Sequence, residues 1–125
     1  MKRMRLSHHA ITVGDMDQAI DIYCGQLGLR LLRRKAGAAY AEVAMLEDAS
    51  GHRIELLLKK GERSGLDHIA FEVDDVDEAF ERLKREGFNP EREPFDVPGG
   101  IVRTSFLRTP DGVKLELMRY AEETK

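Results

Sequence analysis

The chain of 125 residues contains no tryptophan and a single cysteine, Cys24. One thiol cannot form an internal disulfide, so the chain is not a disulfide framework of the kind found in small secreted domains, and a reducing cytoplasm is expected. No apolar run approaches the roughly 20 residues that a membrane-spanning helix needs. The basic start MKRMRLSHH lacks the apolar segment of a secretory signal peptide behind it.

The sequence also lacks a strong charge of one sign. Its formal net charge is -3, and its longest basic run is Arg33-Arg34-Lys35. This pattern argues against a nucleic-acid-binding protein, which needs a basic patch. What the chain does have is 42% hydrophobic and 34% charged residues, the composition of a soluble globular domain with one hydrophobic core.

An internal repeat organises the chain. The segment LSHHAITVGDMDQAI, from Leu6, matches LDHIAFEVDDVDEAF, from Leu66, at seven of fifteen positions, where about one match is expected by chance. LEDASGHRIELL and LRTPDGVKLELM repeat in the same order further on. The repeat predicts two modules, residues 1–58 and 66–125, joined by a linker at 59–65. Because about sixty residues bury too little surface alone, the modules must pack together, within one chain or by exchange between chains.

Each module is predicted to contain one strand, one helix and about three further strands. The opening strands are residues 6–13 and 66–73, and the helix starts follow with capping-box spacing at Asp15 and Asp75. Apolar residues then recur at helical intervals, in the first helix up to Leu27. Gly28 and Gly87 suit a left-handed helix end. The remaining strands are expected at 29–34 and around the turn at 50–51, and at 90–93 and around the turn at 111–112.

The alternation of side chains along the opening strands separates the two adjacent histidines. In the second module Ile69 lies on the apolar face that packs under the helix, and His68 lies on the opposite face. The repeat makes His8 equivalent to His68 and His9 equivalent to Ile69. His9 is therefore expected to be a core or edge histidine on the helix side.

Two glutamates complete the pattern. Glu55 and Glu116 each stand between apolar neighbours on a predicted late strand. A carboxylate facing a sheet interior is costly unless it is paired or bound to a cation. Because both glutamates are in phase with His8 and His68, a shared divalent metal is the simplest partner. Imidazole and carboxylate ligands together suit Ni, Co, Mn, Fe or Zn. The alternative to a metal site is a buried network of polar side chains without metal.

These four residues, in LSHHAITV, HRIELL, LDHIAFEV and PDGVKLEL, make the chain resemble the vicinal oxygen chelate superfamily. That superfamily includes glyoxalase I, methylmalonyl-CoA epimerase, extradiol dioxygenases and bleomycin- or fosfomycin-resistance proteins. The resemblance implies an α+β fold of two βαβββ modules whose curved sheets form a metal-binding cleft, and a homodimer. It also implies that His8, Glu55, His68 and Glu116 bind one divalent ion, with Glu116 or Glu55 as the catalytic base.

The resemblance favours a glyoxalase I-like lyase or isomerase that acts through an enolate or enediolate of a small carbonyl or thioester substrate, with glutathione or another thiol as possible cosubstrate. GLRLLRRK and TPDGVKLEL resemble bacterial glyoxalase I, whereas GLDHIAFEVDDVDEAFERLKREG resembles the epimerase. The segment KAGAAY lacks the carboxylate that the epimerase usually has as one of its catalytic bases. The alternatives are an epimerase-like isomerase, an extradiol dioxygenase-like enzyme and a non-catalytic binding protein of the bleomycin-resistance type.

Other chemically active side chains are assigned weaker roles. Cys24 is expected to pack, and His52 to be solvated beside a turn. Glu42 and Arg103 occupy matching positions, where they either contact substrate or are ordinary sheet charges. The segment 88–100 is either a flap over the cleft or a connector. Three arginines are considered for contact with an anionic substrate: Arg30, Arg33 and Arg34.

Overall fold

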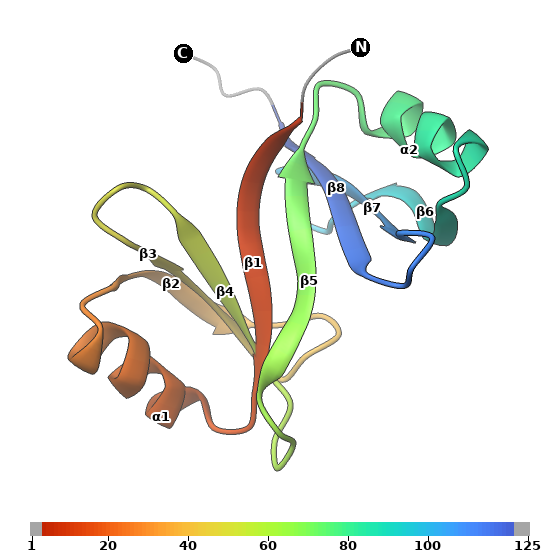
Figure 1. Cartoon of the computed structure of the whole chain (residues 1–125). Coiled ribbons are helices and arrows are strands. Elements are labelled where there is room, and N and C mark those ends of the chain that lie inside the picture. The colour runs from red at the N-terminus through yellow and green to blue at the C-terminus, as the bar shows by residue number, and fades with distance from the viewer. Residues whose placement is uncertain (1–3, 122–125) are drawn as a thin grey trace. The chain divides into compact units, whose positions relative to one another are not determined.

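The structure, a computed structural model, describes residues 4–121, and they divide into two compact units. The N-terminal unit comprises residues 8–67, and the C-terminal unit comprises residues 4–7 and 68–121. The chain begins with β1 (Arg5–Val13), α1 (Met16–Ile20), a π-helical segment η1 (Asp21–Gln26), β2 (Arg30–Ala36), β3 (Glu42–Glu47) and β4 (Arg53–Leu58). It continues with β5 (Gly65–Glu72), α2 (Val76–Arg85), β6 (Asn89–Asp96), β7 (Val102–Arg108) and β8 (Lys114–Tyr120) (Figure 1). The predicted α+β class with two βαβββ repeats is confirmed.

The sheet of the N-terminal unit has the strand order β2-β3-β4-β1. The pairs β2–β3 and β3–β4 are antiparallel, whereas β1 and β4 are parallel, because the helical crossover returns the chain to the same direction. Helix α1 lies against one face of this sheet. Its Met16 and Ala19 pack in a core with strand residues that include Val13, Leu46 and Leu56.

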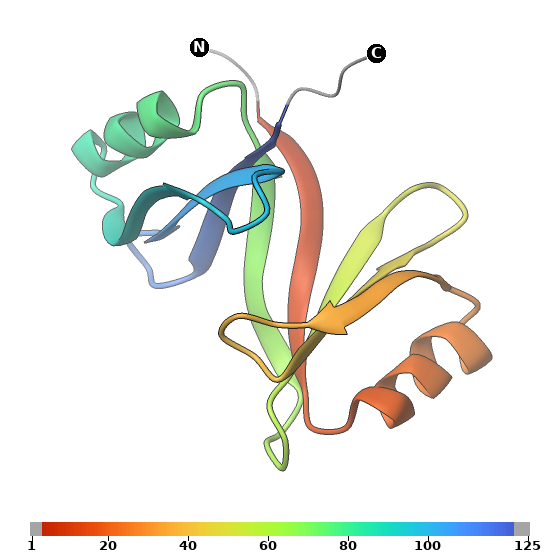
Figure 2. The same cartoon turned by 180° about the vertical axis from the view of Figure 1, so that it is seen from behind.

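The C-terminal unit repeats this arrangement with the order β5-β8-β7-β6. Strands β5 and β8 are parallel, and the other two pairs are antiparallel. Helix α2 buries Val76, Ala79, Phe80 and Leu83, which recur at helical spacing. The helix lies against one face of this sheet (Figure 2). Phe80 is fully buried and packs in a core with strand residues that include Leu107 and Leu117.

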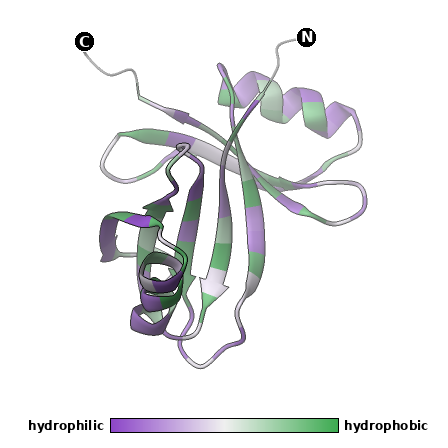
Figure 3. Ribbon diagram, turned by 60° about the vertical axis from the view of Figure 1, so that its left-hand side comes forward, coloured by the Kyte–Doolittle hydropathy of each residue, from purple (hydrophilic) through white to green (hydrophobic). Residues whose placement is uncertain are grey.

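Side chains along the strands alternate between the two faces of each sheet in the predicted phase. Hydrophilic and hydrophobic residues interchange along the strand ribbons (Figure 3), since successive side chains leave opposite faces of a sheet. Ile11 and Val13 pack on the helix side of their unit, and Phe71 and Val73 do so in theirs. The other side of each sheet, opposite its helix, is called the open face below.

The first helix differs from the expected regular stripe. After five α-helical residues it continues as η1, in which the amide of Leu27 donates to the carbonyl of Ile22 at 3.0 Å. A turn that spans five residues shifts later side chains away from the 3.6-residue period. Leu27, predicted to end the apolar stripe, is consequently 63% exposed. Gly28 has a φ of 83° and ends the segment, as predicted.

The segment 88–100 is a strand and a turn rather than a flap. Strand β6 pairs with β7, and its register includes Phe95 opposite Thr104. The turn beyond it closes when the amide of Val97 donates to the carbonyl of Val102 at 2.8 Å. Gly99 and Gly100 both have positive φ there, which only glycine adopts without strain. The strand expected at 90–93 is confirmed and is longer than predicted.

Neither helix within residues 4–121 has the length and apolar character needed to cross a bilayer.

Candidate metal centre

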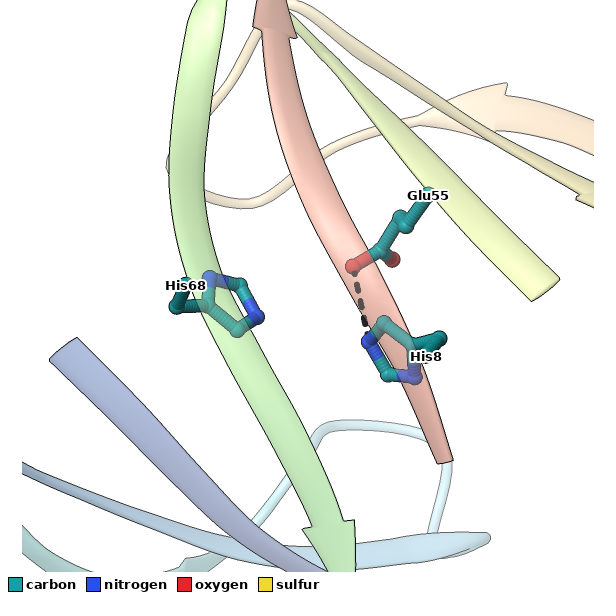
Figure 4. A group of neighbouring side chains, drawn as sticks. All are labelled: His8, Glu55 and His68. Carbon is teal, nitrogen blue, oxygen red and sulfur yellow. Dashed lines mark ion pairs between the residues drawn. The ribbon is translucent and has the colours of Figure 1, made fainter. Parts of the chain in front are cut away.

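The N-terminal unit brings His8 and Glu55 together on its open face. The parallel register of β1 and β4 places Ala10 opposite Glu55, so the carboxylate reaches His8 two residues earlier on β1. Nε2 of His8 and Oε1 of Glu55 are 3.4 Å apart (Figure 4). The imidazole is buried and the carboxylate is partly exposed. One histidine–glutamate pair therefore lies on the open face of this sheet.

The C-terminal unit builds the same pair from His68 and Glu116. Ala70 lies opposite Glu116 in the register of β5 and β8, as Ala10 lies opposite Glu55 in the other unit. Nε2 of His68 and Oε1 of Glu116 are 3.1 Å apart, and both side chains are largely buried. The edge of Phe106 meets the imidazole at a ring-centroid distance of 5.6 Å. The ring is thus held in place by packing as well as by the carboxylate.

Each pair fits two neighbouring ligands of one divalent ion. Nitrogen and oxygen ligands lie about 2.0–2.2 Å from such an ion, so neighbouring ligand atoms are about 3.0 Å apart at right angles and about 3.4 Å apart in a tetrahedron. The two observed separations, 3.1 and 3.4 Å, lie in this range. Buried imidazole beside carboxylate is also a donor set that divalent transition metals prefer.

The two carboxylates are held differently. Thr104 donates from Oγ1 to Oε2 of Glu116 at 2.7 Å, while His68 contacts the other oxygen. Glu55 contacts His8 through one oxygen, and its second oxygen has no hydrogen-bond partner among residues 4–121. The Glu55 side chain is 24% exposed, against 12% for Glu116. Glu116 therefore has a fixed orientation, whereas Glu55 has more freedom to turn.

Two neighbours of these pairs, Thr104 and Tyr40, were not predicted from the sequence. Thr104 lies on β7 in the phase of the open face, so alternation alone could have found it. Tyr40 lies in the loop before β3, where no periodicity guides a prediction, and its hydroxyl donates to Asp67 at 3.3 Å. Burial and the adjacent Asp67 carboxylate raise the pKa of Tyr40. The phenol therefore stays protonated at neutral pH and acts as a hydrogen-bond donor.

The remaining candidate residues lie elsewhere. His9 is on the helix side, as predicted, but it is exposed and does not join the core. His52 is exposed, as expected, and contacts Asp48 at 3.2 Å in the turn before β4. Cys24 packs against the N-terminal core, and burial raises the pKa of its thiol, which disfavours the reactive thiolate.

Glu42 and Arg103 do not face the open side of their sheets. Glu42 binds Arg34 at 2.8 Å, and the same arginine reaches Asp17 in α1 at 2.8 Å. Arg103 binds Asp77 in α2 at 2.7 Å. Of the two alternatives, the structure therefore supports ordinary sheet charges rather than contact with substrate. In both units an arginine from the outer strands ties the sheet to an aspartate in the first helical turn.

The ion pair of Asp77 predicts a pH-dependent stability. Hydrogen bonds from Arg103 hold the pKa of Asp77 below its usual range of about 3.9. The pair therefore stabilises the fold above pH 4 and loses this effect as the pH falls through the lowered pKa. Asp77→Asn is expected to lower the free energy of unfolding at pH 7 by less than about 1 kcal/mol, because Asp77 is 57% exposed.

Denaturant titrations at pH 7 and at pH 2.5 measure this difference. Glu81→Gln on the same helix is the matched control, since it removes an equal charge whose nearest cation, Lys84, is 3.9 Å away. A stability loss that is equal in the two variants, or that is as large at pH 2.5 as at pH 7, would contradict the role of the Asp77 pair.

The chain is thus an α+β protein built from two βαβββ repeats. Each repeat carries a histidine–glutamate pair on the open face of its sheet, and these pairs form the candidate metal centre. The family model for the Glyoxalase/Bleomycin resistance protein/Dioxygenase superfamily matches residues 5–117. The chain belongs to this superfamily, which confirms the resemblance found in its motifs.

Individual relatives include named enzymes. A lactoylglutathione lyase of Escherichia coli O157:H7 is 33% identical over 124 residues, which cover 92% of this chain and 92% of the relative. The solved structure of a hypothetical protein from Bacillus halodurans C-125 has a TM-score of 0.84 at 26% identity and covers 99% of each chain. The structure of methylmalonyl-CoA epimerase from Mycobacterium tuberculosis has a TM-score of 0.79 at 25% identity, covering 94% of this chain and 89% of that one.

Proposed function

We propose that the protein is a divalent-metal-dependent lyase or isomerase of the glyoxalase I type. The observation that carries this proposal is the pair of repeated half-sites, each a buried histidine within 3.4 Å of a glutamate. The proposed ligands are His8, Glu55, His68 and Glu116. The two half-sites would share one ion, whether they come from one chain or from two chains of a homodimer. Relatives named lactoylglutathione lyase support this choice of reaction.

The proposed ligand residues have different roles in the reaction. A bound divalent ion supplies a Lewis acid that stabilises negative charge on substrate oxygens. The histidines orient the site, and Phe106 packing and the Thr104 hydroxyl limit the movement of the C-terminal pair. Partial burial of both glutamates excludes bulk water from one side of each carboxylate. That environment favours proton transfer between carboxylate and substrate over exchange with solvent.

The proton-transfer step uses one of the two carboxylates as a base. A carboxylate oxygen of Glu116 or Glu55 takes the proton from the carbon next to the substrate carbonyl. The electron pair of the broken C–H bond forms a carbon–carbon double bond, and the carbonyl oxygen takes the negative charge. The same carboxylic acid then returns the proton to the neighbouring carbon, the former carbonyl carbon. In a substrate with a hydroxyl on the first carbon, such as the adduct of an aldehyde and a thiol, that hydroxyl becomes a carbonyl and its proton passes to the negatively charged oxygen. The isomerisation is then complete without any oxidant or reductant.

An epimerase-like activity is the second candidate. The structural likeness to methylmalonyl-CoA epimerase favours it. In that reaction the proton is returned to the carbon it left, on the opposite face, which by the family resemblance usually takes a second base. The loop segment KAGAAY offers the phenol of Tyr40 and no carboxylate at this point. The glyoxalase-type reaction, which needs one base, therefore fits this chain better.

Metal analysis of the purified protein, followed by activity assays, tests the proposal. We expect one divalent ion per His–Glu–His–Glu set and metal-dependent turnover of methylglyoxal with glutathione. Turnover of methylmalonyl-CoA instead would support the epimerase. Failure to bind any of Ni, Co, Mn, Fe or Zn on titration would sink both proposals and favour a non-catalytic binding protein. Metal binding without either activity would direct attention to a dioxygenase or another thiol.

The cellular setting is part of the proposal. A cytoplasmic location is consistent with a single cysteine whose thiol packs against a core. A homodimer is proposed by analogy with the family, and size-exclusion chromatography with light scattering measures it. The division into modules 1–58 and 66–125 with a linker at 59–65 likewise remains a prediction.

A further inference from the structure

The open face of the N-terminal unit carries a group of arginines that the proposed proton transfer does not use. Arg53 begins β4 and precedes Glu55 by two residues, so both side chains leave the same face of the sheet. Arg30 and Glu47 join it there, because Glu47 lies opposite both arginines in the strand registers. Arg34, by contrast, lies on the helix side, where Asp17 and Glu42 bind it.

Glu47 fixes the orientation of Arg53. The Nε of Arg53 donates to Oε2 of Glu47 at 3.1 Å, and Arg30 donates from Nη2 to Oε1 at 2.7 Å. The two arginines hold the pKa of Glu47 below its usual range, Arg53 being the stronger contributor. Glu47 is therefore a carboxylate at neutral pH and keeps both guanidinium groups in place. Two arginines around one carboxylate leave one positive charge in excess.

The terminal nitrogens of Arg53 remain available. Its hydrogen bond to Glu47 is made through Nε, and Nη1 and Nη2 make no hydrogen bond within residues 4–121. The side chain is 35% exposed, which is enough for a ligand to reach it. The two terminal nitrogens of a guanidinium form a fork that matches the two oxygens of a carboxylate. Arg53 is thus an oriented cation with an unused bidentate face.

The equivalent position in the C-terminal unit is occupied differently. The repeat matches Arg53 with Lys114, which precedes Glu116 by two residues. The ammonium of Lys114 lies 3.5 Å from Glu91 and 4.9 Å from the centre of the Phe106 ring. In both units two cations share one carboxylate, since Arg108 also binds Glu91, at 2.6 Å. The difference lies in the second cation: a lysine packed over an aromatic ring has no guanidinium fork, whereas Arg53 has one.

We propose that Arg53 recognises an anionic group of the carboxylate class on the substrate, and that Glu47 and Arg30 position it. This inference rests on the proposed function, because it takes the substrate's reacting oxygens to lie at the proposed metal centre near Glu55. Two residues along a strand span about 6.7 Å. The substrate is thus expected to carry its carboxylate several bonds away from the reacting oxygens. Arg53 would select substrates by charge rather than take part in the proton transfer.

Two small chelators that differ by one carboxylate test the proposal. Acetohydroxamate carries only the metal-binding group, whereas the monohydroxamate of succinate carries the same group and a carboxylate two carbons away. Calorimetric titration of the metal-loaded protein measures both dissociation constants. We expect the succinate compound to bind about tenfold more tightly to the wild-type protein, since charge-assisted bidentate contacts are among the stronger polar contacts.

The variant Arg53→Gln is expected to remove this preference and to leave the dissociation constant of acetohydroxamate unchanged. Arg53→Lys keeps the charge but not the fork, and it should restore part of the preference. Arg33→Gln is the matched control, because Arg33 lies opposite Met45 on the same face and is exposed. It removes the same charge, and the tenfold preference should remain.

The outcomes separate this inference from the proposed function. Equal binding of the two chelators to the wild-type protein, or the same preference in Arg53→Gln, would overturn the role of Arg53 and leave the metal centre intact. An equal loss in Arg33→Gln and Arg53→Gln would also overturn it, in favour of a general charge effect. If the protein takes up no metal and neither chelator binds, the proposed function fails, and this inference fails with it.

Discussion

Glu116→Gln is expected to lower kcat by about 10²–10⁴-fold while the protein remains folded. Glutamine cannot accept the substrate proton as a carboxylate does, and it is a weaker metal ligand. The substitution keeps the shape of the side chain, and its amide can still pair with Thr104 and His68, which lie 2.7 and 3.1 Å from the present oxygens. Steady-state kinetics with saturating metal measure the loss, and thermal unfolding checks the fold.

The matching variant Glu55→Gln assigns the base. Glu55 has an oxygen without a hydrogen-bond partner among the described residues and is the more exposed of the two carboxylates. If Glu55 is the base, its variant loses more of kcat than Glu116→Gln does; if Glu116 is the base, the order reverses. His9→Ala is the control, because His9 lies on the helix side. A larger loss of turnover in His9→Ala than in Glu116→Gln would contradict the phase of β1.

His8→Ala is expected to weaken metal binding by at least about a hundredfold. Residues that hydrogen-bond to metal ligands already contribute about 10–100-fold to metal affinity. Removal of a direct ligand should therefore lower the affinity further. The change also leaves Glu55 without the imidazole that lies 3.4 Å away. Titration of the metal-free protein with zinc or nickel, followed by calorimetry, measures the affinity.

The adjacent residue again provides the comparison for this experiment. His9→Ala removes an imidazole from the same strand, one position further along and on the opposite face. Its metal affinity should equal that of the wild type. Equal losses in His8→Ala and His9→Ala would indicate a surface histidine site, and the candidate metal centre would then be wrong.

Much of the architecture could be predicted because it follows from the local periodicity of apolar and polar residues. The repeat of the Leu6 and Leu66 segments indicated two equivalent modules, and period-two alternation separated His8 from His9. Helix starts were predictable since Asp15 and Asp75 each accept the amide hydrogen bond that a capping box requires. These signals act over a few residues and do not depend on what lies far away in the chain.

The errors lie where a distant residue decides. For Glu42 and Arg103 the sequence left open whether they contact substrate or are ordinary sheet charges. Asp17, through Arg34, and Asp77 hold them on the helix side. The end of the first helix became π-helical, which no apolar stripe predicts. The strand β6 was underestimated because its residues are mostly polar and exposed, and its pairing with β7 supplies the hydrogen bonds instead.

The sequence by itself indicated the two repeated modules, the faces of the opening strands, and the four residues proposed as metal ligands. Tertiary structure alone decided which partners those residues have. It brought the hydroxyl of Thr104 to Glu116 and left one oxygen of Glu55 without such a donor. It also put Arg53 and Arg34 on opposite faces of their sheet, with different carboxylate partners. The physical reason is that alternation and capping are properties of one strand or one helix turn. Hydrogen bonds between side chains depend instead on strand register, which only the folded sheet defines.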